Sequence, residues 1–136
     1  MRLDITRRSD LAVRALGALD AAGRLKGPDL AARVATTAAF IGQVMAPLVR
    51  AGWVRSDPGP TGGYVLEVAL GGIGMLDVIE AVEGPTVSDR CVLRGGPCPS
   101  DENCALHDAW VKVRGALLDE LAAIPLTAVV ASQEVA

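Results

Sequence analysis

The sequence predicts a mainly α-helical fold with a small β wing and a long C-terminal helix. Apolar residues recur at helical spacing over most of the 136 residues, and Pro- and Gly-rich segments separate these patterns. Hydrophobic residues make up 51% of the chain but aromatic residues only 3%, so the expected core consists of Ala, Leu, Val and Ile side chains. Ala and Leu also favour helix over strand.

The first three expected helices lie in the N-terminal third of the chain. Ser9 is expected to cap the first helix and Gly23 to end it. A second, short helix begins within GPDLAARVA, where Pro28 takes an early position at which a missing N–H costs little. Thr36 or Thr37 can cap a third helix. A short helix, a tight turn and a longer helix form the helix-turn-helix pattern.

The segment after the third helix has the features of a β hairpin. Two β-prone runs, 53–56 and 64–68, flank the turn sequence DPGPTGG. A hairpin at this position is a wing, and winged helix-turn-helix proteins mostly bind DNA, with the third helix in the major groove. A fourth helix around Leu76, Ile79 and Val82 is closed by Gly84. We therefore assign residues 1–84 to a winged helix-turn-helix DNA-binding domain.

The last long helix carries an apolar stripe and is followed by Pro125. The stripe has spacings of 4, 3, 4, 4 and 3, close to a heptad seam, and consists of Leu106, Trp110, Val113, Leu117, Leu121 and Ile124. It could pack on its own domain, but we favour a dimer seam. DNA-binding proteins with two-fold symmetry need a second chain, which fixes the distance between the two half-sites that they bind. Residues 106–136 are thus predicted to be a dimerisation helix and C-terminal tail.

The charge is unevenly distributed along the chain. Residues 1–67 carry 9 Lys/Arg against 6 Asp/Glu, whereas residues 68–136 carry 4 against 10. This balance fits a DNA-facing half and a sensing half, although solvated faces explain it almost as well. No apolar run reaches the roughly 20 residues of a membrane span, so we expect a soluble, cytoplasmic protein without a membrane partner. Thiols stay reduced in that compartment, which argues against a disulfide framework.

All three cysteines and the only histidine fall within 17 residues: Cys91, Cys98, Cys104 and His107. The Gly- and Pro-rich segment between them is a flexible loop, predicted over residues 85–105. Buried structural thiols make little sense in so polar a loop. Three Cys and one His are an ordinary zinc set, but tight Cys-x-x-Cys knuckles are missing. The wide spacing favours an iron–sulfur cluster over zinc.

The ordered set of motifs resembles the Rrf2 family of bacterial regulators. The matching features are the opening MRL, RAGWVRS after the third helix, PTGGYVL in the wing, LDVIEAVEG, the three-cysteine loop and CALHDAW. The resemblance covers essentially the whole chain. It implies a homodimeric transcriptional regulator, usually a repressor, in which three cysteines of each subunit hold one iron–sulfur cluster. The cluster can be lost in an aerobic preparation.

The resemblance leaves the fourth ligand open. His107 matches the histidine that completes a 2Fe–2S site in the IscR type, three residues after the last cysteine. Asp10 matches the aspartate of the other subunit that completes a 4Fe–4S site in the NsrR type. Both residues also have a local interpretation. Asp10 could place a favourable negative charge in the first turn of its helix, and His107 could cap its own helix. We favour His107, because it is local and needs no second chain.

The chain departs from the family pattern in three places. Gly42 and Pro47 lie in the third helix, and Pro47 is expected to kink it near its C-terminal end. Pro58 stands where the wing usually carries an arginine, with Arg55 as the nearest substitute. Six residues, rather than five, separate the first two cysteines. These departures bear on the operator sequence and the cluster type.

DNA affinity is expected to come from phosphate contacts, and specificity from the third helix. The phosphate contacts are assigned to Arg2, Arg7, Arg8, Arg33, Arg50 and Arg55. The base-facing residues and the wing tip are Thr36, Thr37, Ala39, Phe40, Gln43, Thr61, Gly62 and Gly63. Gln43 could pair with adenine and Thr37 with a base or a phosphate, whereas Phe40 serves a base or the core equally well.

The sequence therefore predicts a DNA-binding regulator of a palindromic operator, controlled by a cluster that senses nitric oxide, redox state or iron–sulfur status. One alternative is a zinc-stabilised DNA-binding module without sensing. A small metal- or thiol-dependent enzyme is disfavoured, because no carboxylate pair or nucleophile–base set is evident.

Overall fold

The computed structural model describes residues 1–86, 90–98 and 103–135. The elements follow in the order α1 (Arg7–Ala22), β1 (Arg24–Leu25), α2 (Gly27–Arg33), α3 (Ala38–Arg50), β2 (Val54–Asp57), β3 (Gly63–Leu66), the 3-10 turn η1 (Leu70–Gly72), α4 (Met75–Glu83), α5 (His107–Ala123) and α6 (Leu126–Val135). The predicted fold class, mainly α with a small β wing, is confirmed.

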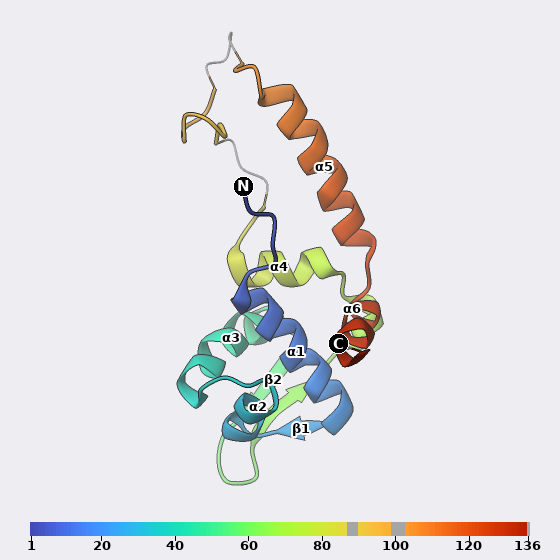
Figure 1. Cartoon of the computed structure of the whole chain (residues 1–136). Coiled ribbons are helices and arrows are strands. Elements are labelled where there is room, and N and C mark those ends of the chain that lie inside the picture. Colours follow the sequence, from blue (N-terminus) through green and yellow to red (C-terminus); the bar gives the residue numbers. More distant parts are fainter. Residues whose placement is uncertain (87–89, 99–102, 136) are drawn as a thin grey trace.

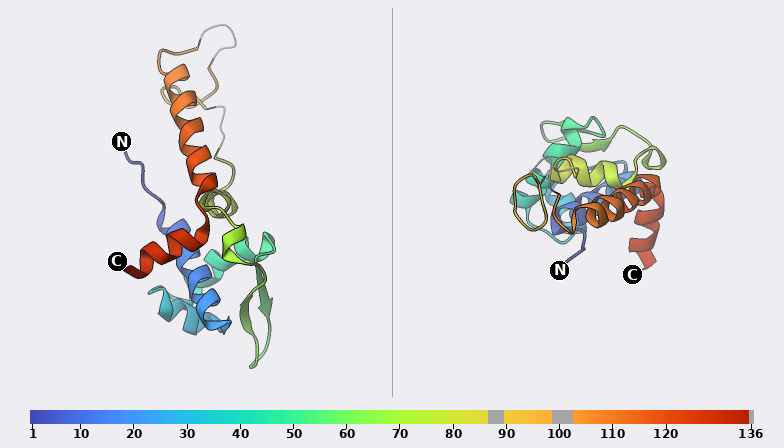
Figure 2. Two further views of the ribbon diagram at one scale, coloured as in Figure 1. Left: turned by 90° about the vertical axis from the view of Figure 1, so that its right-hand side faces the viewer. Right: turned by 90° about the horizontal axis from the view of Figure 1, so that it is seen from above.

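The molecule has two parts that differ in packing (Figure 1). The head, residues 6–83 and 126–135, contains α1 to α4, the sheet and α6. The arm comprises the described residues of 90–124: the cysteine loop and α5, which stands out from the head with the loop at its far end (Figure 2). Residues 87–89 and 99–102 of the predicted 85–105 loop lie outside the described residues.

The first helix begins earlier than predicted. Thr6 is the N-cap: its backbone is extended and its hydroxyl accepts a hydrogen bond from the Ser9 N–H at 3.2 Å. Ser9, the predicted cap, lies inside the helix and is fully buried. Its hydroxyl donates to Glu83 Oε2 at 2.5 Å and so connects the start of α1 to the end of α4. Gly23 ends α1 as predicted, with a φ of 82°.

The helix-turn-helix is confirmed in α2 and α3. Thr37 caps α3 by accepting from the Phe40 N–H at 3.1 Å. The turn between the helices needs a positive φ, 58°, at Ala35. The inner face of α3 is buried as expected, and the helix continues through Pro47 to Arg50. Its buried residues join those of α1, α2 and α4 in one core.

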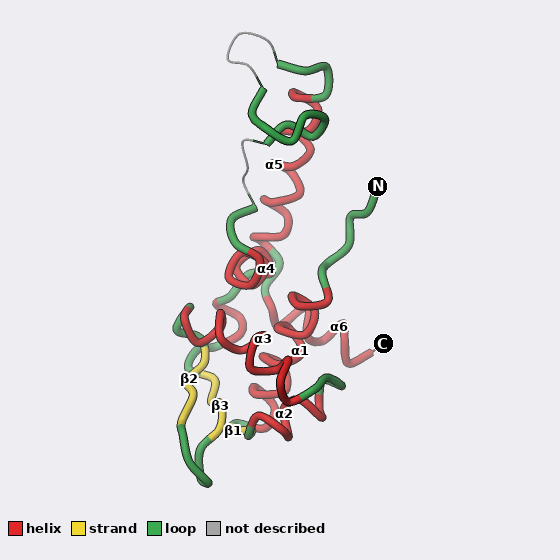
Figure 3. The backbone as a smooth tube through the Cα atoms, turned by 90° about the vertical axis from the view of Figure 1, so that its left-hand side faces the viewer, coloured by secondary structure: helices red, strands yellow, loops and turns green. Residues whose placement is uncertain are grey.

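The wing forms as predicted, with strands shifted by about one residue. β2 and β3 pair antiparallel from Val54↔Leu66 to Asp57↔Gly63. The two-residue strand β1 also pairs with β3, which gives the sheet order β1-β3-β2 (Figure 3). A Cβ at Gly63 would lie 2.7 Å from the carbonyl oxygen of Leu25, and one at Gly62 would fall on that of Asp57. Both glycines are therefore required by close backbone approach.

The prediction of a C-terminal tail is wrong for residues 126–135. Pro125 ends α5, but the chain resumes as α6, with Leu126 fully buried. The Leu126 N–H donates to the Ile73 carbonyl, and the Met75 N–H donates to the Ile124 carbonyl, both at 2.9 Å. These bonds fasten the junction of α5 and α6 to the start of α4, and α6 then packs across α1.

Among the described residues, no single helix is long and apolar enough to span a membrane. By length and composition alone, the bent pair of α2 and α3, at 98° to each other, passes the same test.

Candidate functional site

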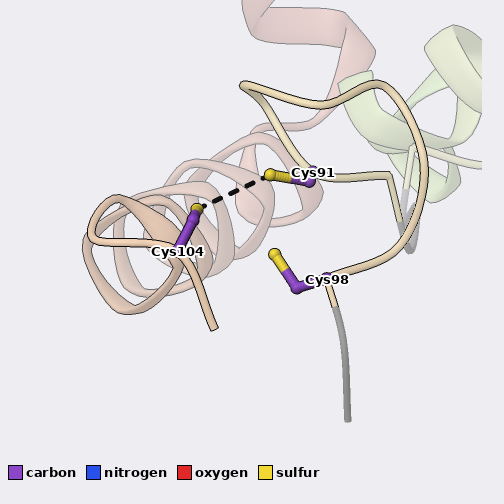
Figure 4. Close-up of side chains that lie close together, drawn as sticks. All are labelled: Cys91, Cys98 and Cys104. Carbon is purple, nitrogen blue, oxygen red and sulfur yellow. Dashed lines mark hydrogen bonds between the residues drawn. The ribbon is translucent and has the colours of Figure 1, made fainter. Parts of the chain in front are cut away.

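The three cysteines converge at the far end of the arm (Figure 4). Their sulfur atoms all lie within 4.8 Å of one another, and Cys91 Sγ lies 3.5 Å from Cys104 Sγ. Cys91 is buried, whereas Cys98 and Cys104 are half-buried. Cys91 and Cys98 lie in the segment 90–98, and Cys104 lies in the segment 103–106. The convergence of their sulfur atoms therefore places these two segments next to each other. The predicted grouping of the cysteines is thus present in the structure.

Local backbone bonds shape the loop around Cys91. The Cys91 N–H donates to the Gly96 carbonyl at 2.6 Å, and the Gly95 N–H donates back to the Cys91 carbonyl at 3.0 Å. Gly95 has a φ of 73°, which favours glycine. Arg90 Nε donates to the Gly95 carbonyl at 2.7 Å. The glycines that the sequence analysis took as signs of flexibility therefore close a tight turn.

The turn makes the two neighbouring thiols chemically different. The Leu93 N–H points at Cys91 Sγ from 3.4 Å and, with the Arg94 N–H, lowers the pKa of Cys91 to about 7. At Cys98, the Cys104 N–H lowers the pKa, but the Cys91 and Cys104 thiols and burial outweigh it, so the pKa of Cys98 is raised. A thiol whose pKa is close to neutral is ready to bind metal as a thiolate.

The sulfur positions fit a metal centre. A tetrahedral ion with metal–sulfur bonds of about 2.3 Å separates its sulfur ligands by about 3.8 Å. The separation of 3.5 Å between Cys91 Sγ and Cys104 Sγ is close to that value, and all three sulfur atoms lie within 4.8 Å of one another. Iron–sulfur clusters are held by the same thiolates. The site therefore offers three of the four ligands that either kind of centre needs.

The two candidates for the fourth ligand lie in different places. His107 is half-buried and is the first residue of α5. Its backbone N–H donates to the Cys104 carbonyl at 3.0 Å. Among the described residues, the group of ligand atoms within 4.8 Å contains the three cysteines and not His107. Asp10 lies on α1, in the head, where it accepts from Arg14 Nε at 2.9 Å and from Gln133 Nε2 at 3.0 Å.

The residues expected to read bases lie in the first half of α3 and just before it. Thr37, Ala39 and Gln43 are exposed, and Thr36 is half-buried. Phe40 packs partly against the core, and the Arg8 guanidinium lies 5.9 Å from its ring centroid, within cation–π range. Arg8, assigned to a phosphate contact, and Phe40, assigned to a base or the core, are therefore in contact with each other at the start of α3.

The arginines differ in how far they are already paired. Arg7, Arg33 and Arg50 are exposed and form no ion pair within the described part of the chain. Arg2 pairs with Asp4 at 2.6 Å in the exposed N-terminal segment. Such exposed pairs are weak, about 0–1 kcal/mol, and a phosphate can displace them.

Arg55 stands in an ion-pair network on the wing that the sequence analysis missed. It binds Asp57 and Glu67, and Arg24 of β1 binds Asp57 at 2.9 Å. Hydrogen bonds from Arg55 and then Arg24 lower the pKa of Asp57, and hydrogen bonds to Asp57 and then Glu67 raise the pKa of Arg55. Thr61, at the tip of the wing, is exposed. Only the pairing of β1 with β3 brings Arg24 to this place, so no local pattern could have indicated it.

The apolar stripe of α5 is largely uncovered within one chain. α5 has no buried residue, and Val113 is 66% and Leu117 48% exposed. Leu106 and Ile124 are also exposed, Trp110 is half-buried, and Leu121 packs on the core of the head. With Met1 and Leu3, the middle of the stripe lines an apolar pocket of about 340 Å³. An exposed apolar patch of this extent is typical of an interaction surface.

A family model described as an iron-dependent transcriptional regulator, Rrf2, matches residues 5–132. The chain belongs to the Rrf2 family. The IscR regulators of Citrobacter koseri and Salmonella paratyphi B are each 32% identical over 114 residues, which cover 84% of this chain and 69% of the relative. The family resemblance found in the sequence is confirmed.

Solved structures of the Rrf2 family share the fold. CymR, described as the global cysteine regulator of B. subtilis, superposes with a TM-score of 0.74 at 25% identity and covers 96% of this chain and 98% of its own. T. potens IscR superposes with a TM-score of 0.72 at 22% identity, over 96% of this chain and 88% of its own. The protein is thus an Rrf2-family transcriptional regulator with a DNA-binding winged helix, and its three neighbouring cysteines can bind a metal.

Proposed function

We propose that this Rrf2 protein is a homodimeric repressor whose binding to a palindromic operator is controlled by an iron–sulfur cluster. Cys91, Cys98 and Cys104 would hold the cluster, one in each subunit. When bound, the cluster would supply iron that reacts with nitric oxide or oxidants and reports on iron–sulfur status. The convergence of three sulfur atoms within 4.8 Å, in a loop that leads into α5, carries the proposal.

Helix α4 connects the cysteine loop to the helices that carry the DNA-reading surface. The C-terminal end of α4 leads into the cysteine loop, and its N-terminal end binds the end of α5 through the Met75 N–H and the Ile124 carbonyl. Both ends of the arm are thus anchored on one nine-residue helix. That helix packs on α1 and α3. Tightening or releasing the loop would therefore shift α4, and with it the recognition helix α3.

The exposed stripe of α5 would pair the two subunits and set the distance between their α3 helices. Operator affinity responds to the cluster only if the loaded and empty dimers hold the two α3 helices at different spacings. Arg7, Arg33 and Arg50 would contact phosphates, and Gln43 would contact a base edge. Arg55 would first have to leave Asp57 and Glu67, so we expect it to contribute less than Arg50.

The fourth ligand is proposed to be His107, three residues after Cys104 on the first turn of α5. The alternative is Asp10 of the partner subunit. Changing His107→Ala and Asp10→Ala separately distinguishes them, because loss of the true ligand changes the visible spectrum of the loaded protein while loss of the other leaves it unaltered.

Protein purified without oxygen tests the proposal directly. It should be brown, with a thiolate-to-iron absorption band and bound iron and sulfide. Its gel shift on its own upstream region should change when nitric oxide is added. A variant with Cys91, Cys98 and Cys104 all changed to Ala should lose the colour and the response. Equal operator binding by this variant, with no response to gas or oxidant in either protein, would refute the proposal.

The compact sulfur spacing favours one second candidate, a zinc-stabilised DNA-binding module without sensing. The observed spacing matches that around one tetrahedral ion, as calculated above. Colourless protein with one zinc per chain would establish this candidate in place of the cluster.

A further inference from the structure

The contact between Cys91 and Cys104 suggests a second chemistry for the cysteine site when no metal is bound. The Cys91 thiol donates to Cys104 Sγ at 3.5 Å, and Figure 4 shows the two side chains pointing toward each other across the loop. A disulfide has an S–S length of about 2.05 Å, so the two sulfurs need to approach by only about 1.5 Å.

We infer that Cys91 and Cys104 of the metal-free chain form a disulfide on oxidation, which closes the site to metal until a thiol reductant reopens it. This inference goes beyond the proposed function, because it needs only the metal-free protein and holds whether the resident metal is iron or zinc. Cys98, although near both sulfurs, would be left as a single thiol.

The reaction with hydrogen peroxide consumes the two thiols in two steps. The thiolate of Cys91 or Cys104 attacks one oxygen of the peroxide: an S–O bond forms, the O–O bond breaks, and the hydroxide that leaves takes up a proton to become water. The other thiol then attacks the sulfur of the sulfenic acid. The S–S bond forms, the S–O bond breaks, and the hydroxyl departs as water with the thiol proton. Two thiols thus lose two electrons and two protons, and one peroxide becomes two waters.

The disulfide would have two structural consequences. It removes two of the three sulfur ligands at once, because a disulfide sulfur carries no thiolate charge for a metal. It also ties the turn at residues 91–96 to the segment that starts α5, much as a metal would. The disulfide and a bound metal would thus impose a similar constraint on the arm, but one chain could not hold both.

The test uses full-length protein, stripped of metal with a chelator and freed of reductant, and treated with one equivalent of hydrogen peroxide. Free thiols should fall from three per chain to one. Trypsin cuts after Arg90 and Arg94, which isolates Cys91 from a peptide that holds both Cys98 and Cys104. The linked peptide pair should therefore appear in mass spectra and vanish on reduction.

Two single-cysteine substitutions identify which cysteine forms the disulfide with Cys91. Cys98→Ala is the matched control and should form the linked pair within about twofold of the rate of the unmodified protein, whereas Cys104→Ala should form it at least about tenfold more slowly. Linkage through Cys98, disulfides between chains, or oxidation without loss of paired thiols would overturn the inference.

Zn²⁺ serves as the probe for closure of the site. Competition with a coloured chelator should show Zn²⁺ affinity at least about 100-fold weaker after oxidation, and a thiol reductant should restore it. Unchanged Zn²⁺ affinity in fully linked protein would show that the disulfide does not close the site. None of these readouts depends on cluster loading or on operator binding, so failure here and failure of the proposed function can be told apart.

Discussion

The head and the arm bury their side chains to very different degrees. In the head, leucines of α1, α2, α3 and α6 are fully buried in one core, and α4 adds Val78. In the arm, the seventeen residues of α5 include none that is buried, and Val111, Val113 and Leu117 are exposed, although Leu121 packs on the head. Burial of apolar surface is the main favourable term in folding, so the head is stabilised by contacts within the chain. We propose that the arm depends on partners outside the chain, namely a metal at its tip and a second subunit along α5.

The largest effect is expected from a charge placed in the exposed stripe. Val113→Glu would put a carboxylate into an apolar seam, where burying it without a partner is costly. The dimer should dissociate, and operator affinity should fall by about 10²- to 10⁴-fold, the advantage that linking two binding sites gives. Sedimentation and fluorescence anisotropy measure the two effects, while the melting of the head should stay nearly unchanged.

Val111→Glu is the matched control for this change, because Val111 is 53% exposed but lies outside the stripe. It should leave the dimer intact. Dissociation by Val111→Glu together with an intact dimer in Val113→Glu would show that the seam lies on another face of α5.

The next largest effect tests whether α6 belongs to the head. Leu126→Ala removes a fully buried side chain at the start of α6 and should lower the free energy of unfolding by about 2–5 kcal/mol. Denaturant titration measures this, and exposed Thr127→Ala should change it by less than about 0.5 kcal/mol. Equal stability of the two variants would mean that α6 packs elsewhere.

The comparison of head and arm also explains which features the sequence could predict. Helices α1 to α4, the wing and the end of α1 at Gly23 follow from local spacing, capping and turn residues, which act over a few positions. The first cap was misassigned because Thr6 and Ser9 are both good cap residues, and the choice depended on a tertiary contact of Ser9 with Glu83. A pattern within one segment contains no such information.

Features that depend on distant segments were missed. β1 has two residues and exists only because β3 pairs with it. Helix α6 follows Pro125, and its segment has no clear apolar stripe, so it read as a tail. The cysteine spacing indicated a metal site, but the 3.5 Å contact between Cys91 and Cys104 depends on how the loop folds back on α5.

A smaller effect concerns the arm alone, because all three cysteines lie in it. In metal-free, reduced protein, the thiolate of Cys91 should form around pH 7, so its alkylation by iodoacetamide should reach half its plateau there and cease at lower pH. Cys98, whose pKa is raised, should follow only at distinctly higher pH. At pH 7 the thiolate fraction of Cys91 should exceed that of an ordinary cysteine by about 15-fold. In urea the pH profiles should merge; one common profile in the folded protein would contradict the assignment.

The smallest effect concerns the hydrogen bond between α6 and Asp10 within the head. Gln133→Ala removes the bond from α6 to Asp10 and should weaken the docking of α6 by about 0.5–1.5 kcal/mol, the usual net value of a hydrogen bond. Hydrogen exchange of the α6 amides measures it. Ser132→Ala, whose hydroxyl bonds only within the helix, is the control and should leave that exchange unaltered.

The same measurement separates the two candidate ligands. If Asp10 binds the partner's cluster, loading must compete with its bonds to Gln133 and Arg14, and α6 should exchange faster in the loaded dimer than in the empty one. If His107 is the ligand, loading leaves these bonds intact, and α6 exchange should be the same in both states. Because Gln133→Ala already lacks one of the bonds, its α6 exchange should respond less to loading in the first case and not at all in the second. A response in the native protein that persists at full size in Gln133→Ala would exclude Asp10 as the link between the cluster and α6.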